Sequence, residues 1–330
     1  MTATINPVER LTVQAAEETR RIAATLRDQL GSLGRRGLVV AMSGGIDSSV
    51  CAGLAVRAVG PARVFGLMLP ERESDPASLA LARRWADQLG IDHAVEDIAP
   101  ILEACGCYRR RDEAIARVVP GYGPGWRSKL VISGNRLDSD RLNVTSLAVQ
   151  PPGGDVRTVR LPPAEYRQIV AATNFKQRAR KMLEYYHADR LHYAVVGTPN
   201  RLEYDQGFFV KGGDGLADVK PIAHLYKTQV YRLADHLGVP EEIRTRPPTT
   251  DTFSLPQSQE EFYFALPAAT LDIVLSGMNA GRTSAAVGEE LGFGPEQIDR
   301  AYRDIEQKRA ATKYLHAAPL LIEPVPEVHG

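Results

Sequence analysis

Apolar residues along the chain form two kinds of pattern, short continuous runs and helix-spaced stripes. In residues 9–30 the apolar side chains recur every three or four positions, which predicts an amphipathic helix. The run GLVVAM at 37–42 is wholly apolar, as in a strand buried inside a parallel sheet. The following elements are predicted as helices at 49–59 and 75–90 and as strands at 62–69 and 92–98. This βαβαβ order predicts an α/β fold with a doubly wound, mainly parallel sheet flanked by helices.

The pattern breaks at residues 105–165, which are rich in Gly, Pro and Arg. Within them, LNVTSLAVQPPGGDVRTVRL predicts two short strands around a Pro-Pro-Gly-Gly-Asp turn, so we expect an insertion that carries a hairpin. The later elements are predicted as a helix at 164–191, a fourth buried strand at 192–198, a helix at 226–239, and a helical C-terminal part at 265–330 that includes helices at 283–292 and 294–315. We interpret residues 1–330 as one domain with these additions.

Composition narrows the functional classes. Lys and Arg number 40, as do Asp and Glu, so no global field favours nucleic acid as the main substrate. No run of 18 apolar residues and no signal-peptide core occurs, so we expect no membrane partner and a cytoplasmic protein. Three cysteines, Cys51, Cys105 and Cys107, are too few for a disulfide framework and indicate a reducing compartment.

The stretch VVAMSGGIDSSVCAG at 39–53 ends the first strand with glycines at the head of a helix. In an open parallel sheet, ligands bind beyond the carboxyl ends of the strands. Gly44 and Gly45 expose backbone N–H groups there, and the hydroxyls of Ser43, Ser48 and Ser49 add donors at a helix N-terminus, so we expect a phosphate or pyrophosphate site. Asp47 would repel phosphate unless a divalent cation lies between them, which makes it a candidate Mg²⁺ ligand; otherwise it complements the helix dipole.

The motif Ser-Gly-Gly-x-Asp-Ser after a first strand resembles the pyrophosphate-binding loop of the N-type ATP pyrophosphatases, with their Rossmann-like fold. Four later segments are similar to the NAD synthetases of that group: NFKQRARKM (174–182), the long stretch 195–243, RPPTTDT (246–252) and QSQEE (257–261). The chain is therefore identified as a member of the NAD synthetase family over roughly residues 36–100 and 170–315. Because 36 residues precede the first strand, we expect the ammonia-dependent type without a glutaminase domain.

The resemblance implies roles for particular residues. It implies a metal site made by Asp47, Glu203 and Thr249. It implies ATP and pyrophosphate contacts from Ser43, Gly44, Gly45, Asp47, Ser48, Ser49, Leu67, Thr198, Lys227 and Thr249, and acid-substrate contacts from Arg178, Lys211, Asp214 and Asp218. Catalytic roles fall to Asp47, Lys227 and Asp214, of which Asp214 could take a proton from the attacking amine while its Gly-rich loop excludes water.

The implied reaction uses ATP and Mg²⁺. A substrate carboxylate is adenylated with release of pyrophosphate, and ammonia then displaces AMP to leave an amide. For an NAD synthetase the acid is nicotinic acid adenine dinucleotide. The resemblance also implies a homodimer that uses free ammonia or a separate amidotransferase.

Three alternatives stay open. The 77 residues between positions 97 and 174, with arginines such as Arg109, Arg127 and Arg136, favour a different carboxylate or a different amine. A nucleotide-binding regulator without catalysis is disfavoured by the retention of Asp47 and Lys227 with the other matched residues. A tRNA-thiolating enzyme would need reactive cysteines near the loop.

Overall fold

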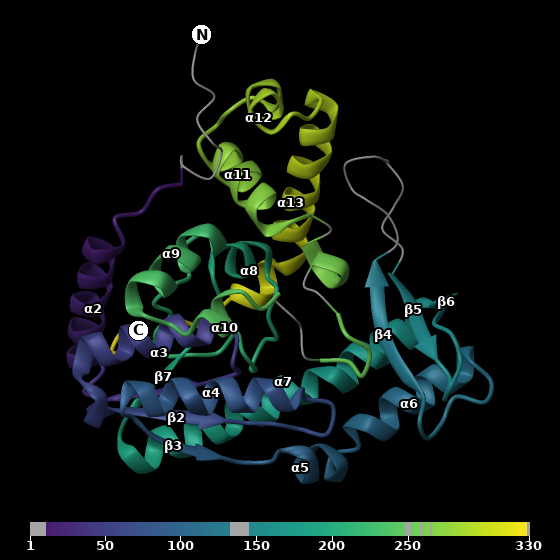
Figure 1. The fold of residues 1–330 in the computed structure, drawn as a ribbon, viewed down its shortest axis with the longest axis horizontal. Helices are drawn as coiled ribbons and strands as arrows, with labels where there is room; N and C mark the ends of the chain where they lie inside the picture. The colour runs from purple at the N-terminus through teal and green to yellow at the C-terminus, as the bar shows by residue number, and fades with distance from the viewer. Residues whose placement is uncertain (1–10, 133–144, 248–251, 258–259, 265, 329–330) are drawn as a thin grey trace.

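A four-stranded parallel sheet in the order β3–β2–β1–β7 forms the centre of the molecule (Figure 1). The computed structural model describes residues 11–132, 145–247, 252–257, 260–264 and 266–328. The strands are β1 (Leu38–Ala41), β2 (Val64–Met68), β3 (Asp92–Val95) and β7 (Ala194–Val196). All four predicted strands are confirmed, and so is the doubly wound α/β fold. The strand order reverses between β1 and β7, which makes the carboxyl end of β1 the topological switch point.

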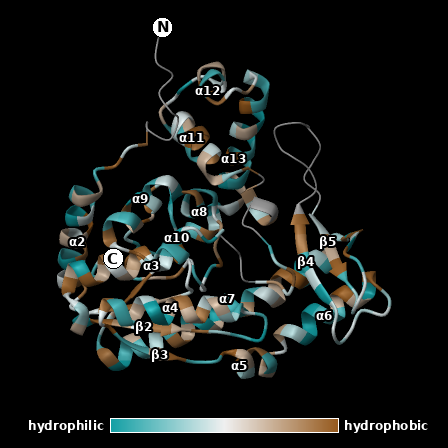
Figure 2. Cartoon of the chain, viewed as in Figure 1, coloured by the Kyte–Doolittle hydropathy of each residue, from teal (hydrophilic) through white to brown (hydrophobic). Residues whose placement is uncertain are grey.

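Helices cover both faces of this sheet. Leu38, Val40 and Met68 pack on one face against α2, α3, α4 and α9, whereas Val39 and Leu67 pack on the other against α5, α6 and α7. Neighbouring strand residues point to opposite faces, so burial of both faces explains the continuous apolar runs. Figure 2 shows apolar residues along β2 and mixed residues on the covering helices. These helices are α2 (Ala15–Ser32), α3 (Ile46–Val59), α4 (Pro76–Leu89), α5 (Ala99–Ala104), α6 (Cys107–Val118), α7 (Pro163–Leu191) and α9 (Lys227–Leu237), and a 3₁₀ turn spans Pro61–Arg63.

A second sheet is antiparallel, with the order β4–β5–β6. Its strands are β4 (Arg127–Ile132), β5 (Thr145–Gln150) and β6 (Arg157–Arg160). The hairpin predicted around Pro-Pro-Gly-Gly-Asp is confirmed as β5–β6, with Ser146 opposite Arg160 and Val149 opposite Arg157. The sequence analysis did not predict β4, nor the helix α6 at the start of residues 105–165. Leu130, Leu147 and Phe253 share a buried cluster beneath this sheet with Ile115 of α6 and Ile169 of α7.

The helices predicted at 283–292 and 294–315 are confirmed as α12 and α13. The helical part predicted at 265–330 ends at His316, however, because residues 317–328, which contain Pro319, Pro324 and Pro326, form no helix. Figure 1 shows α11, α12 and α13 grouped above the parallel-sheet core, where they share their own apolar cluster. The remaining elements are α8 (Arg201–Gln206), α10 (Glu241–Arg244), a π-helical turn (Glu260–Phe264), α11 (Ala268–Asn279), α12 (Ser284–Leu291) and α13 (Pro295–His316). Within the described ranges, no helix has the length and apolar character needed to cross a membrane.

Candidate active site

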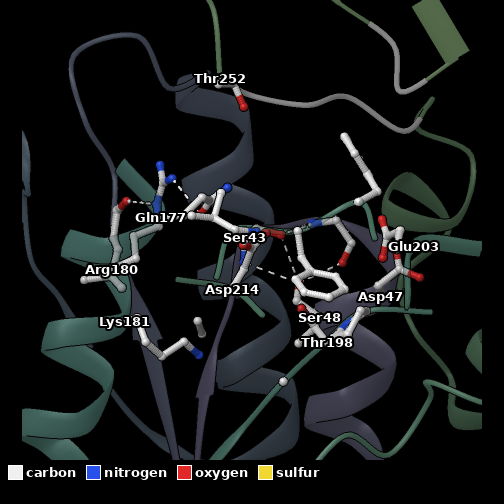
Figure 3. Close-up of a pocket in the computed structure, with 18 of the residues that line it drawn as sticks. Ser43, Asp47, Ser48, Gln177, Arg180, Lys181, Thr198, Glu203, Asp214 and Thr252 are labelled. Atoms are coloured by element: carbon white, nitrogen blue, oxygen red, sulfur yellow. Dashed lines mark hydrogen bonds between the residues drawn. The ribbon is translucent and has the colours of Figure 1, made fainter. Parts of the chain in front are cut away.

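A cleft of about 560 Å³ opens at the carboxyl edge of the parallel sheet. It is bounded by the β1–α3 loop, by α7, and by the segments that follow β7 (Figure 3). Most of the sequence-predicted residues line it: Ser43, Gly45, Asp47, Ser48, Leu67, Arg178, Thr198, Glu203, Lys211, Asp214 and Lys227. Gly44, Ser49 and Asp218 are not among its lining residues, and Thr249 lies outside the described residues.

The β1–α3 loop needs glycine at position 44. Gly44 has a φ of +76°, and a Cβ added there would lie 2.2 Å from the carbonyl oxygen of Ser78. The Gly45 N–H donates to Ser43 Oγ at 3.2 Å, and Ser48 Oγ donates to the Gly45 carbonyl at 3.0 Å. Side-chain hydroxyls therefore hold the loop tightly around the N-terminus of α3, with Ser43 and Ser48 facing the cleft.

Ser49 has a different place from its neighbours. Its Oγ donates to the Gly45 carbonyl at 2.9 Å, its own carbonyl accepts the indole N–H of Trp85, and the residue is buried. Ser49 and Gly44 thus shape the loop from behind, whereas Ser43 and Ser48 present their hydroxyls to the cleft.

Three charged residues from distant parts of the chain meet beside this loop. Lys227, at the start of α9, forms an ion pair with Asp47, and Glu203 of α8 lies beside Asp47 (Figure 3). Burial opposes the charge on Lys227, but Asp47 and Glu203 outweigh that effect and raise the pKa of the amine. Asn200 joins the two acids, since its side chain donates to Asp47 at 3.3 Å and caps α8 reciprocally with Glu203.

The donor set suits Mg²⁺. Asp47 and Glu203 offer two neighbouring carboxylates, and Mg²⁺ in proteins is commonly held by one or two carboxylates together with substrate phosphates. Among the described residues, no cluster of three or more His, Cys, Asp or Glu side chains forms a metal site. Two protein carboxylates would therefore need oxygen ligands from elsewhere, and the predicted hydroxyl of Thr249 is one source.

Sequence reasoning missed the residue that fixes Lys227. Asp272 of α11 is fully buried and accepts the backbone N–H groups of Lys227 at 3.1 Å and Thr228 at 2.7 Å. It therefore caps α9 from another helix, and burial raises its pKa to about 6. No local signal marks it, because the contact joins residues 45 positions apart.

The α7 wall carries charges that the sequence analysis did not assign. Lys181 and Glu184 form a buried ion pair at 2.6 Å, and burial raises the pKa of Glu184. Arg180 donates to the carbonyl of Leu69 at 3.2 Å, whereas the predicted Arg178 is exposed and donates to the carbonyl of Lys211 at 3.3 Å. The segment NFKQRARKM thus supplies more of the cleft wall than Arg178 alone.

The Gly-rich loop after α8 separates its two predicted acids. Asp214 lines the cleft and accepts the Val210 N–H at 2.7 Å, and burial raises its pKa. Asp218 instead accepts the Val195 N–H of β7 at 2.7 Å and the Tyr185 hydroxyl at 3.2 Å, which ties the loop to the sheet. Lys211 lies at the cleft, and its amine donates to the carbonyls of Tyr314 and Ala317 at the end of α13.

Two of the cysteines are poor nucleophiles. Cys51 is fully buried, and burial together with Asp47 and Glu203 raises its pKa well above the ordinary value. Burial raises the pKa of Cys107 to about 11. Both thiols therefore stay protonated at neutral pH, which argues against the thiolation alternative.

The sheet is doubly wound, and a Gly-Ser loop lies at its switch point. A buried Lys–Asp pair with a second acid lies beside that loop, and this combination is typical of nucleotide-dependent enzymes. The NAD synthase family model matches residues 18–118 and 154–314. The chain belongs to the NAD synthase family.

Curated relatives match nearly the whole chain. It is 62% identical to an NH(3)-dependent NAD(+) synthetase of Mesorhizobium japonicum over 94% of this chain and 98% of the relative. It is 59% identical to an NH(3)-dependent NAD(+) synthetase of Rhizobium meliloti over 96% of this chain and 95% of the relative.

Solved structures share the fold at lower identity. An NMN synthetase from Francisella tularensis has a TM-score of 0.66 at 22% identity, covering 94% of this chain and 99% of its own. An NH3-dependent NAD synthetase from Campylobacter jejuni has a TM-score of 0.61 at 20% identity, covering 94% of this chain and 100% of its own.

The family match also indicates which part of the predicted insertion at 105–165 lies outside the family model. Residues 119–153 lie between the two matched ranges. They include β4 and β5 but not α6, so the unmatched segment is shorter than the predicted insertion at 105–165.

Proposed function

We propose that this protein joins ammonia to the carboxylate of nicotinic acid adenine dinucleotide, forming NAD with conversion of ATP to AMP and pyrophosphate. The observation that carries this proposal is the group formed by Asp47, Lys227 and Glu203 beside the Ser-Gly-Gly loop, in a member of the NAD synthase family. The relatives named as NH(3)-dependent NAD(+) synthetases support ammonia as the nitrogen source.

The first step activates the acid. A carboxylate oxygen of the substrate attacks the α-phosphorus of ATP, and the bond between this phosphorus and the bridging oxygen breaks to release pyrophosphate. The β1–α3 loop binds the departing phosphates, and Lys227 places a buried positive charge beside them. Asp47 and Glu203, with the predicted hydroxyl of Thr249, would hold Mg²⁺, which would neutralise further phosphate charge when bound.

The second step forms the amide. Ammonia attacks the acyl carbon of the adenylate, and the bond from this carbon to the phosphate oxygen breaks to release AMP. The nitrogen must lose a proton, and Asp214 is our candidate base because it lines the cleft and its pKa is raised. The side chains of Arg178 and Lys211 lie close to the Gly-rich loop that carries Asp214, and we propose that they bind the acid substrate.

Several further features belong to the proposal. We infer Mg²⁺ as the cofactor from the oxygen donors of Asp47 and Glu203. A homodimer, a cytoplasmic location and the use of free ammonia or a separate amidotransferase follow from the family resemblance.

The test is a product assay on the purified chain with ATP, Mg²⁺, ammonium and nicotinic acid adenine dinucleotide. We expect AMP, pyrophosphate and NAD in equal amounts, identified by mass. The matched control replaces the dinucleotide with nicotinic acid mononucleotide, which presents the same pyridine carboxylate without the adenylyl half. Turnover of the mononucleotide but not of the dinucleotide would contradict the proposal and favour the alternative in which a different acid is amidated.

A further inference from the structure

Segment 252–257 is an irregular stretch that lies beside the edge strand β4 and is hydrogen-bonded to it. Leu255 N–H donates to the Ser128 carbonyl at 3.2 Å, and Ser128 N–H donates to Ser254 Oγ at 2.8 Å. The side chain of Gln257 donates to the Leu130 carbonyl. The segment therefore depends on β4 for its backbone path, and β4 lies in the stretch that the family model leaves unmatched.

The other end of the segment is held by a buried lysine. Lys176 of α7 is 1% exposed, and its amine donates to the Thr252 carbonyl at 2.7 Å. The same amine pairs with Glu71 at 2.8 Å and with Glu73 at 2.7 Å. Because these carboxylates fix the ammonium in the protein interior, the Thr252 carbonyl is bound to a rigid donor.

The charges around Lys176 balance. Arg111 of α6 also pairs with Glu73 at 2.7 Å, and Tyr108 donates to Glu71 at 2.7 Å. With Arg72 and Asp112 at the edge of the network, three positive groups face three carboxylates. Lys176 and Arg111 outweigh burial and lower the pKa of Glu73. The network joins α6, α7 and the loop after β2, so Lys176 connects segment 252–257 to all three of them.

The segment contributes to the cleft wall on the α7 side. Thr252 lines the cleft, as do Thr173 and Gln177 of α7. Figure 3 shows Thr252 apart from Asp47 and Glu203, which lie beside the phosphate loop. Phe253 is buried against the antiparallel sheet, and its ring packs at a tilt against that of Phe262, a further lining residue, with 5.7 Å between the ring centroids.

We propose that β4 and Lys176 are positioning elements for the acid substrate: they hold segment 252–257 so that Thr252 lines the α7 side of the cleft. The proposal assigns a role in substrate binding to residues 119–153, which contain β4, and it rests on the proposed function. Its consequence is selective. Loosening the segment weakens binding of nicotinic acid adenine dinucleotide more than binding of ATP.

The experiment removes two side-chain contacts between the segment and β4 with the double variant S254A/Q257L. Q150L is the matched control, because Gln150 lies in the same sheet but donates to the Gly154 carbonyl in the hairpin turn. We expect the KM for the dinucleotide to rise about tenfold in the double variant, the size of effect from losing two hydrogen bonds, with the KM for ATP within about twofold of the native value. K176M should also raise the KM for the dinucleotide. If K176M does not fold, the double variant alone tests the proposal.

Hydrogen exchange makes the inference independent of turnover. We expect the amide of Leu255 to exchange faster in S254A/Q257L and at the native rate in Q150L. Unchanged exchange, or an equal rise in both KM values, would overturn the inference. A native chain that makes no NAD would instead overturn the proposed function, and the exchange result would still decide whether β4 and Lys176 position the segment.

Discussion

A buried lysine next to two acids is the most informative residue-scale feature of the cleft. Lys227 keeps its charge in the interior because Asp47 and Glu203 are close to it. In the proposed reaction, the phosphates of ATP would bring negative charge next to the amine, and the two carboxylates would bind Mg²⁺. The charges of Lys227, Asp47 and Glu203 would therefore be balanced both before and after ATP binds.

We expect D47N to lower kcat/KM for ATP by at least about 100-fold, because it removes a metal ligand and the partner of Lys227. The fold should persist, as judged by circular dichroism. D235N is the control, since Asp235 pairs with Arg244 at the surface, 73% exposed. Turnover of D47N near the native rate would remove Asp47 from the metal site.

The two acids of the Gly-rich loop should respond differently to the same substitution. We expect D214N to lower kcat by about 100-fold or more with the KM for ATP little changed, because it removes the proposed base. D218N should chiefly lower thermal stability, because Asp218 holds the Val195 N–H of β7. Measuring kcat and melting temperature for both variants checks this. A large loss of kcat in D218N alone would restore the role implied for it by resemblance.

At this scale the sequence predicts best what is local. Asp47 could be found from the chain alone because an acid beside a Gly-Gly turn at a helix N-terminus is an unusual arrangement. Asp272 could not be found, since its function is to cap a helix that begins 45 positions earlier.

Among the elements, the β1–α3 loop has the strictest backbone requirement. We expect G44A to raise the KM for ATP at least about tenfold, because alanine disfavours the φ of +76° and its Cβ would collide with the Ser78 carbonyl. G34A is a close control: Gly34 has a φ of +63°, but open space surrounds its Cβ direction. Its variant should lose stability without any change in KM. Equal KM values for G44A and the native chain would contradict the assignment of this loop to ATP.

The packing of α11 on the start of α9 should be visible as a pH dependence of stability. The pKa of Asp272 is about 6 in the folded protein, above its ordinary value. A raised acid pKa means that the folded chain holds the proton more tightly, so this stabilisation is complete below about pH 4 and is lost as the pH rises through about 6.

In D272N this titration is absent. We therefore expect the unfolding free energy of D272N, relative to the native chain, to shift in favour of the variant by roughly 2 kcal/mol between about pH 4 and pH 7. Urea unfolding across that pH range measures it. A difference that stays constant with pH would contradict the raised pKa.

Elements differ in how well they could be predicted. The strand at 37–42 is buried on both faces, and its apolar run is readable without partners. β4 begins with Arg127, Ser128 and Lys129, and its strand character comes from pairing with β5 and segment 252–257. Likewise α6 carries Arg111, which is buried only because Glu73 and Asp112 neutralise it.

At the scale of the whole molecule, each of the two sheets supports a different half of the cleft. The β1–α3 loop, proposed to bind phosphate, lies at the switch point of the parallel sheet, and the antiparallel sheet lies beside α7 (Figure 1). Family resemblance could predict the first half because its motifs are continuous in sequence. The second half joins residues 71–73, 176 and 252–257 with an unmatched segment, so only the folded structure reveals it. The interpretation as one domain stays a prediction.

The central claim is that the acid is activated by forming an acyl adenylate within this cleft, and one isotope measurement tests it directly. The protein is incubated with ATP, Mg²⁺, ammonium and nicotinic acid adenine dinucleotide labelled with ¹⁸O in its carboxylate. The mass of the AMP produced is then measured by mass spectrometry. The account predicts one ¹⁸O atom in each AMP formed with NAD, because the attacking carboxylate oxygen leaves with the α-phosphorus. Unlabelled AMP formed together with NAD would contradict it.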